Sequence, residues 1–341
     1  MKNFSVKVSV CVPVCGTKDF LTDCLAGIAG QDFDGIQIVV VEDENDGPEK
    51  KQNEKCVQKI LKAFKKQCRG RSIELKFIKH GKNCGLTEAR RTALYASDGE
   101  YVMFLDSDDT LPPGAIKALW NTAKEKNVQI VHGAADVCVN GSADIQQSYG
   151  RIEKIRKKAG LVFNGSLSGS QIFEGFLVKK SFCGFLWGKL FDRELLLKAY
   201  GKIPFVYCVL AEDFLASFFI TFFARSYEGI EQKVYNYSVN TGISSSKKIT
   251  SIEEWKKVCS TAGVFTIILS AVEEDDELKS EITEEQKECI KAECRFYAKN
   301  NLDQLKAMVV PELYSQAYEE LCEWWGRKMI EGIENTEEQA E

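Results

Sequence analysis

Acidic side chains gather in one short segment of the chain, where an apolar run ends. Asp106, Asp108 and Asp109 follow the hydrophobic residues 101–105. Carboxylates two residues apart in an extended turn can point the same way, and their oxygens suit a hard cation such as Mg²⁺ or Mn²⁺. Three close carboxylates repel one another unless a cation or hydrogen-bond donors compensate. The pattern therefore predicts a divalent-metal site with room for phosphate oxygens.

Helix capping is the simpler explanation of these acids. A helix is expected to begin near Pro112 and Pro113, and Asp108, Asp109 or Thr110 could accept hydrogen bonds from its first N–H groups. Capping needs one such residue, whereas the segment holds three acids after a hydrophobic run. We therefore favour metal–nucleotide binding.

A second acidic segment follows the apolar residues 36–41. Glu42 or Asp43 at its start could accept a hydrogen bond from a nucleobase N–H. A solvated acidic turn explains the segment equally well, because Asn, Asp and Gly favour turns. This motif alone does not decide between the two.

The elements that must position these acids alternate along the first part of the chain. Five β-rich runs are separated by helix-like stretches, which predicts an α/β fold with a mostly parallel central sheet flanked by helices. Ligands in such sheets gather beyond the carboxyl ends of the strands, where both acidic segments lie. The expected strands cover residues 8–12, 36–41, 73–78, 101–105 and 128–131, and the expected helices 19–29, 53–67, 87–97 and 113–125.

The rest of the chain has a different pattern. Residues 134–170 are rich in Gly, Ser and Asn and predict a long, mobile excursion, and residues 241–248 predict a turn region or flap. From Ser251 onward the pattern is helical. We expect a domain at 1–248, with a nucleotide-binding half at 1–133 and an acceptor-side half at 134–248, followed by a C-terminal helical region at 249–341.

Composition excludes several classes of protein. With 341 residues, 44% of them hydrophobic, the chain can bury a core, and its net charge of −5 offers no basic field for nucleic acid. Thirteen scattered cysteines without a C-x-x-C spacing predict reduced thiols, and the two histidines, His80 and His132, are expected to be structural.

No apolar run reaches the roughly 20 residues of a spanning helix, which predicts a cytoplasmic protein. The basic residues 151–158 leave open a peripheral contact with the inner face of a membrane, although a solvated surface is the simpler explanation.

Taken in order, the motifs over residues 8–246 resemble those of family-two glycosyltransferases with the GT-A fold. The shared pattern is a strand closing on proline, a strand ending in paired acids, an Asn-x-Gly segment before an arginine-bearing helix, an Asp-x-Asp motif, a Trp-x-Lys segment and a Glu-Asp pair opening an apolar helix. The residues that carry it are Pro13, Glu42-Asp43, Asn83 to Arg90, Asp106 to Asp108, Trp187 to Lys189 and Glu212-Asp213.

The resemblance implies an activity. A sugar would move from a nucleotide-diphosphate donor, a UDP-sugar, to a hydroxyl of a glycan or glycolipid, with inversion and with Mn²⁺ or Mg²⁺, in bacterial surface polysaccharide synthesis. The resemblance also implies a role for each site residue. Pro13, Arg90 and one of the two acids Glu42 and Asp43 would line a nucleobase pocket. Asp106 would contact the ribose or the metal, Asp108 would bind the cation, Lys189 would contact the diphosphate or the acceptor, and Asp213 would be the general base.

Three alternatives remain at this point. Asp213 could instead be an acid that stabilises a helix N-terminus. A sugar-nucleotide pyrophosphorylase shares a related fold, but it would need a glycine-rich signature that the segment after residue 14 is too short to supply. A non-catalytic nucleotide-sugar-binding protein would have little need of Asp213. The sequence leaves the donor sugar, the acceptor and the oligomeric state open.

Overall fold

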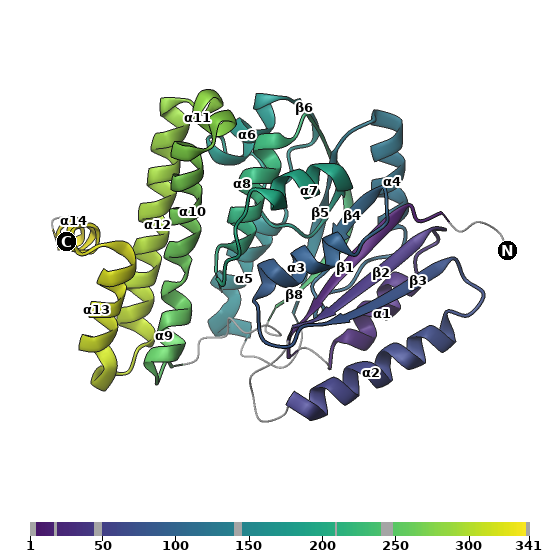
Figure 1. Ribbon diagram of the computed structural model, residues 1–341, viewed down its shortest axis with the longest axis horizontal. Coiled ribbons are helices and arrows are strands. Elements are labelled where there is room, and N and C mark those ends of the chain that lie inside the picture. Colours follow the sequence, from purple (N-terminus) through teal and green to yellow (C-terminus); the bar gives the residue numbers. More distant parts are fainter. Residues whose placement is uncertain are drawn as a thin grey trace.

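A single eight-stranded sheet organises the part of the chain that the computed structural model describes, which comprises residues 5–16, 19–43, 50–139, 145–208, 210–239 and 248–338. The strand order is β3-β2-β1-β4-β7-β5-β8-β6 (Figure 1). The strands are β1 (Val8–Val14), β2 (Ile36–Glu42), β3 (Ile73–Lys79), β4 (Tyr101–Phe104), β5 (Ile130–Val139), β6 (Gly165–Ser168), β7 (Lys189–Asp192) and β8 (Ser226–Val239).

The predicted mostly parallel sheet is confirmed. Strands β1 to β4 run parallel, and so do β5 and β8, while β7 and β6 run antiparallel to their neighbours. Every residue of β1 and β2 is buried, as expected for strands covered on both faces. Because Val14 pairs with Glu42, the carboxyl ends of β1 and β2 meet at one edge of the sheet.

Helices cover both faces of the sheet. The side chains of β1 alternate, so that Val10 and Val12 enter one core and Cys11 enters the other. Helices α1, α2 and α4 pack in the first core, and α3, α6, α7 and α8 pack in the second. Their bounds are α1 Leu21–Ala29, α2 Lys50–Gln67, α3 Leu86–Tyr95, α4 Ala115–Lys126, α5 Ile145–Ala159, α6 Ser170–Leu177, α7 Arg193–Gly201 and α8 Glu212–Phe223.

The predicted helical region at the C-terminal end of the chain is also confirmed. It stacks beside α6 and α8 (Figure 1), and its Trp255 and Phe265 belong to the same hydrophobic core as Phe218 of α8. We therefore regard these helices as built onto the sheet unit, although the division at residue 248 stays a prediction. They are α9 (Ile252–Cys259), α10 (Thr261–Glu274), α11 (Asp276–Glu281), α12 (Glu284–Met308), α13 (Tyr314–Trp325) and α14 (Arg327–Glu338), with a 3₁₀ turn at Pro311–Leu313.

One prediction for the middle of the chain is wrong. The segment 134–170 is not a long excursion, because β5 continues to Val139 and is followed by α5 and β6. Ile152 and Ala159 of α5 are buried. Strand β6 forms by backbone pairing with β8, which the side-chain pattern of its sequence does not predict. Residues 140–144, and nearly all of the expected flap at 241–248, lie outside the described residues.

Residues Ile252–Glu274, which form α9 and α10, are long and apolar enough to cross a membrane by length and composition alone. The sequence analysis did not single them out. Half of their most apolar window is buried inside the protein, where Trp255, Phe265 and Ile268 contribute to the core. Burial of this kind is what a core helix of a globular protein shows.

Candidate active site

The Asp-x-Asp segment forms a tight turn directly after β4. The amide of Asp109 donates to the carbonyl of Asp106 over 3.0 Å, which closes the turn. Asp106 and Asp108 are half-buried, whereas the intervening Ser107 and the following Asp109 are buried. The two carboxylates expected to bind a cation are therefore the accessible ones. Helix α4 begins later, and its N-cap Gly114 makes no side-chain capping bond, so the capping explanation does not apply.

The third acid of the segment fastens the turn to β8. Asp109 accepts hydrogen bonds from the Tyr235 hydroxyl at 2.7 Å and the Ser238 amide at 2.6 Å. The same Tyr235 oxygen accepts a bond from the Asp106 amide at 3.2 Å. Burial, with the nearby Asp106 charge, raises the pKa of Asp109 to about 8. From the sequence, Tyr235 is expected only as part of a possible flap, and its bond to Asp109 is not predicted, because the two residues lie 126 positions apart.

Arg90, on α3, joins the Asp-x-Asp turn to the start of α8. Its guanidinium donates to Asp213 at 2.5 Å and to Asp106 at 3.0 Å, and it lies 4.0 Å from Glu212. Arg90 is buried, which disfavours its charge, but Asp213, Asp106 and Glu212 outweigh this effect and hold the pKa of Arg90 above its ordinary value. The Arg90 guanidinium thus brings together Asp106 and Asp213. The implied contact between Arg90 and a nucleobase stays a prediction, and no bond described for Arg90 points to it.

The Glu212-Asp213 pair opens a helix whose next nine residues include no charged side chain. Residues Leu215 to Phe223 are all buried, so both acids lie at the N-terminus of a helix whose remaining residues are mostly apolar and buried. Burial raises the pKa of Asp213, with Arg90 opposing the shift, and burial together with the Asp213 charge raises the pKa of Glu212 to about 8. Burial thus makes both acids of the pair weaker than free carboxylic acids, and the Asp213 carboxyl is held by Arg90.

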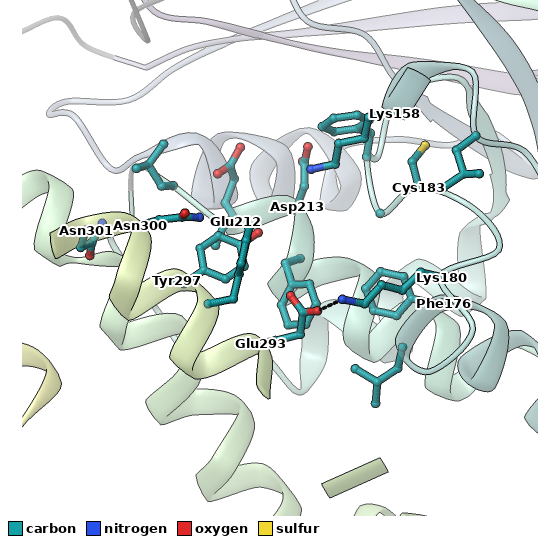
Figure 2. A pocket seen from close by; sticks show the side chains of 18 of the residues that line it. Lys158, Phe176, Lys180, Cys183, Glu212, Asp213, Glu293, Tyr297, Asn300 and Asn301 are labelled. Atoms are coloured by element: carbon teal, nitrogen blue, oxygen red, sulfur yellow. Dashed lines mark hydrogen bonds and ion pairs between the residues drawn. The ribbon is translucent and has the colours of Figure 1, made fainter. Parts of the chain in front are cut away.

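A cavity of about 820 Å³ opens beside these two acids (Figure 2). Glu212 and Asp213 lie on one side of it, and α12 with Tyr297 and Asn300 lies on another. Its volume is in the range of pockets that hold small organic ligands. The general base predicted from the sequence is therefore next to a space that a substrate can enter.

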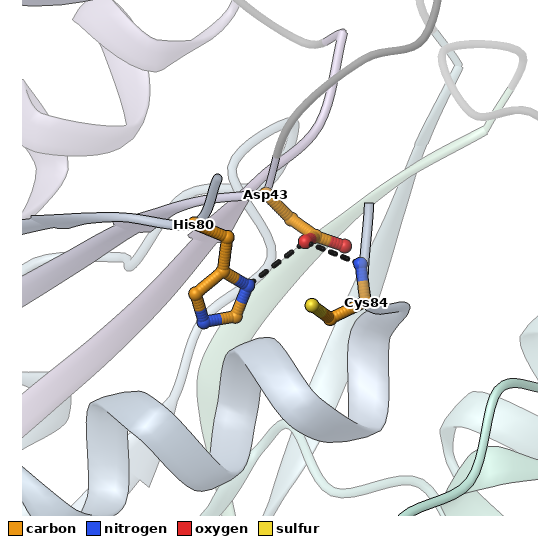
Figure 3. Close-up of side chains that lie close together, drawn as sticks. All are labelled: Asp43, His80 and Cys84. Atoms are coloured by element: carbon orange, nitrogen blue, oxygen red, sulfur yellow. Dashed lines mark hydrogen bonds and ion pairs between the residues drawn. The ribbon is translucent and has the colours of Figure 1, made fainter. Parts of the chain in front are cut away.

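Asp43 occupies the other end of the site, at the carboxyl end of β2. It accepts bonds from His80 Nδ1 at 2.9 Å and from the amides of Cys84 and Gly85, each at 2.8 Å (Figure 3). The remaining ring nitrogen of His80 pairs with the hydroxyl of Thr92 at 2.9 Å. Gly85, with φ of 87°, begins α3, so Asp43 fixes the start of the helix that carries Arg90. The structural role expected for His80 is consistent with this geometry.

The same three side chains, Asp43, His80 and Cys84, could also hold a metal ion, because one ligand atom of each lies within 4.8 Å of the others. Both ring nitrogens of His80 already make hydrogen bonds, and the Cys84 thiol contacts the carbonyl of Lys82 at 3.5 Å. Since these bonds account for the arrangement, we interpret it as a brace of the loop. The sequence analysis did not detect it, because Asp43 is far from the other two residues along the chain.

Pro13 and Glu42 lie at the same edge as Asp43. Pro13 is buried in β1 and pairs in register with Val41, and the Asp43 amide donates to the carbonyl of Val14 at 2.9 Å. The Glu42 carbonyl accepts from the His80 amide at 2.9 Å. Of the residues expected around a nucleobase, Pro13, Glu42 and Asp43 therefore share one edge of the sheet, while their contacts with a base stay predictions.

Lys189, at the start of β7, is buried, and burial lowers the pKa of its ammonium group. The ammonium donates to the carbonyl of Cys183 at 3.0 Å and to that of Phe185. Both residues line the cavity, so Lys189 holds its wall from behind. A contact with the diphosphate or acceptor stays a prediction, and the described geometry supports a positioning role instead.

This sheet order and these acidic strand ends define a protein of the GT-A class. The model of the family described as Glycosyl transferase family 2 matches residues 9–186, and the chain belongs to this family. The putative glycosyltransferase EpsH of Bacillus subtilis is 28% identical over 243 residues, which are 68% of this chain and 61% of EpsH. The chain therefore spans less than two thirds of that relative.

Solved structures of low sequence identity share the fold. Staphylococcus aureus TarS 1–349 in complex with UDP-GlcNAc has a TM-score of 0.54 and 17% identity, with 98% of this chain and 93% of that chain covered. The mannosyltransferase PcManGT from Pyrobaculum calidifontis, in complex with GDP-Man and Mn²⁺, has a TM-score of 0.52 and 15% identity, with coverage of 89% and 75%. The first match includes the C-terminal helices of this chain in its coverage.

Proposed function

We propose that this chain is a metal-assisted, inverting glycosyltransferase that moves a sugar from a nucleotide diphosphate, a UDP-sugar, to a hydroxyl of a glycan or glycolipid. The observation that carries the proposal is the Arg90 bridge, which links Asp213, a residue that lines the cavity, to Asp106 of the Asp-x-Asp turn. Family membership supports the reaction class, and the UDP-GlcNAc and Mn²⁺ complexes of proteins with this fold support the donor and the cation.

The accessible acids of the turn fit a divalent cation. Asp106 and Asp108 present carboxylate oxygens, the ligands that Mg²⁺ and Mn²⁺ prefer, on the half-buried positions of the turn. When bound, the cation would stabilise the negative charge that develops on the departing diphosphate. Asp109 would hold the turn in place through Tyr235, without binding the cation itself.

Asp213 would act as the general base. The acceptor oxygen forms a bond to the anomeric carbon of the donor while the bond from that carbon to the diphosphate oxygen breaks. The electron pair leaves with the nucleoside diphosphate, and the hydroxyl proton passes to Asp213. Attack from the face opposite the leaving group inverts the anomeric centre. A raised pKa favours this role, because a base accepts a proton best when its pKa lies near the working pH.

A donor screen by calorimetry tests the proposal. We expect UDP and one or more UDP-sugars to bind in the presence of Mn²⁺ and to bind more weakly in EDTA, with GDP as the matched control nucleotide. Binding of none of these nucleotides, with or without metal, would contradict a glycosyltransferase. Release or consumption of pyrophosphate would favour the pyrophosphorylase alternative. Surface polysaccharide synthesis and a place in the cytoplasm, at the inner face of the membrane, remain proposals that rest on the resemblance.

A further inference from the structure

The cavity beside Asp213 is built partly by the C-terminal helices, outside the segment that the family model matches. That match ends at residue 186, whereas α12 lines the cavity with residues from Glu293 to Met308. Figure 2 shows Tyr297 and Asn300 on α12, across from Glu212 and Asp213. A molecule that presents a hydroxyl to Asp213 from this cavity can therefore contact α12.

Both aromatic rings and side-chain amides line this wall of the cavity. Phe296 is 56% exposed although it lines the cavity, which leaves a large apolar ring open to a ligand. Tyr297, one residue on, is half-buried against Phe214 and Phe265. Asn300, half-buried one turn further, adds a side-chain amide that can both donate and accept hydrogen bonds.

Charges along the cavity are largely paired with one another. Lys180 forms an ion pair with Glu293 across the cavity (Figure 2), and the Arg90 guanidinium beneath the site is paired with Asp213. The Lys158 ammonium lies 4.8 Å from the centre of the Phe185 ring. Among the described lining residues, the wall therefore offers no cluster of unpaired cations that would attract a polymer rich in phosphate.

We infer that this cavity is the acceptor site and that it takes a neutral saccharide, with Phe296 and Asn300 of α12 as binding residues. Aromatic rings pack against the C–H faces of a sugar ring, while amides and carboxylates bond its hydroxyls. The inference rests on the proposed function: the bound saccharide supplies the oxygen that bonds the anomeric carbon, nucleoside diphosphate leaves, and Asp213 takes the proton. It adds the chemical class of the acceptor and the part of the chain that selects it.

The test uses the full chain and separates the acceptor from the donor. Phe296→Ala and Asn300→Ala are compared with Trp324→Ala, a matched control on α13 whose side chain is 41% exposed and does not line the cavity. Two readouts are recorded: slow hydrolysis of the UDP-sugar without acceptor, and transfer to p-nitrophenyl glycosides of glucose, galactose and N-acetylglucosamine or to poly(ribitol phosphate).

We expect transfer to at least one neutral glycoside, with an acceptor KM about three- to tenfold higher in Phe296→Ala and Asn300→Ala. Donor hydrolysis should stay within twofold of the unmodified chain in all three variants, and Trp324→Ala should match it in both readouts. Unchanged acceptor KM in the two α12 variants would overturn the role of α12. Transfer to poly(ribitol phosphate) alone, or to no acceptor despite normal donor hydrolysis, would overturn the neutral saccharide. Absence of nucleotide binding and donor hydrolysis would instead count against the proposed function.

Discussion

Two carboxylates at opposite ends of the site, Asp43 and Asp213, differ in how many hydrogen bonds the protein already gives them. Asp43 is 4% exposed and accepts three bonds, from one histidine and two backbone amides. The Asp213 side chain is 20% exposed, and the single bond described for it comes from the Arg90 guanidinium. The end predicted to bind the nucleobase is thus braced by the protein itself, whereas the end predicted to carry the general base keeps a carboxylate partly open to the cavity.

The difference separates a positioning carboxylate from a reactive one. A carboxylate has about four lone-pair sites, so the three bonds to Asp43 leave little capacity for a ligand. Asp213 keeps most of its capacity, and burial raises its pKa toward the range of a useful base. Loss of Asp43 should therefore disturb structure first and binding second, whereas loss of Asp213 should disturb the reaction first and also remove one of the carboxylates that pair the buried Arg90.

The largest effect is expected for Asp213→Asn. The amide cannot take a proton from the acceptor, so the rate of transfer should fall by roughly 10²- to 10⁴-fold. Binding of UDP with Mn²⁺, measured by calorimetry, should change little, because the Asp-x-Asp turn is untouched. Glu212→Gln is the matched control: burial and the Asp213 charge raise the pKa of Glu212 itself to about 8, so at neutral pH the amide replaces a largely neutral side chain and most activity should remain. A normal rate of transfer in Asp213→Asn would remove the general-base assignment.

Asp108→Ala should have the next largest effect, and on binding instead of on the chemical step alone. Removing a direct ligand should weaken Mn²⁺-dependent binding of UDP by roughly a hundredfold, since even outer-shell partners of metal sites contribute 10- to 100-fold. Binding of UDP in EDTA should be the same as in the unmodified chain. If titration of UDP with Mn²⁺ gives the same affinity for both proteins, Asp108 is not a metal ligand.

Asp43→Asn tests how much the three hydrogen bonds to the Asp43 carboxylate stabilise the protein. The amide keeps one acceptor oxygen but turns an NH₂ group toward the N–H groups of His80, Cys84 or Gly85, so at least one bond to a charged acceptor is lost. We expect a loss of about 1.5–3 kcal/mol in the free energy of unfolding, with a weaker affinity for UDP.

Urea unfolding measures the first effect of Asp43→Asn and calorimetry the second. Asp32→Asn serves as the control, because the Asp32 side chain is 92% exposed and bonds only Lys117 among the described contacts. Unchanged stability in Asp43→Asn, combined with a large loss of UDP affinity, would show that Asp43 contacts the nucleobase directly and that its bonds to the loop are dispensable.

The sheet and the acidic strand ends could be predicted because their signals are local. The runs that became β1 and β2 are mostly apolar, and the acids at 106–109 follow β4 after the single residue Leu105. Parallel topology then requires that the ends of β1, β2 and β4 meet at one edge. Asp106 and Asp213 were named from the sequence, and the structure places both on one guanidinium.

The remaining features depend on contacts between distant segments. Tyr235 reaches Asp109 across 126 residues, and the amides that fix Asp43 belong to a loop about 40 residues away. Strand β6 forms through backbone pairing with β8, which its sequence Gly-Ser-Leu-Ser does not announce. The role of α12 in the cavity has no motif, because any amphipathic helix could have packed there. The type of a side chain shows which kinds of group it can bond, but the packing of distant segments decides which of those groups it meets.

The smallest expected effect concerns Asp109, a carboxylate braced like Asp43 but placed next to other acids. Its pKa is about 8 in the folded protein, against an ordinary value of 3.8, so between these values the folded state binds more protons than the unfolded state. Stability should therefore fall as pH rises from 5 to 8 in EDTA, with Glu212 contributing in the same direction. Asp109→Asn, which removes the titrating group, should flatten part of this dependence in urea unfolding, while Asp32→Asn should retain all of it. Stability that rises over this range would mean that Asp109 is ionised in the fold and compensated by donors, which would make it a third candidate ligand for the cation.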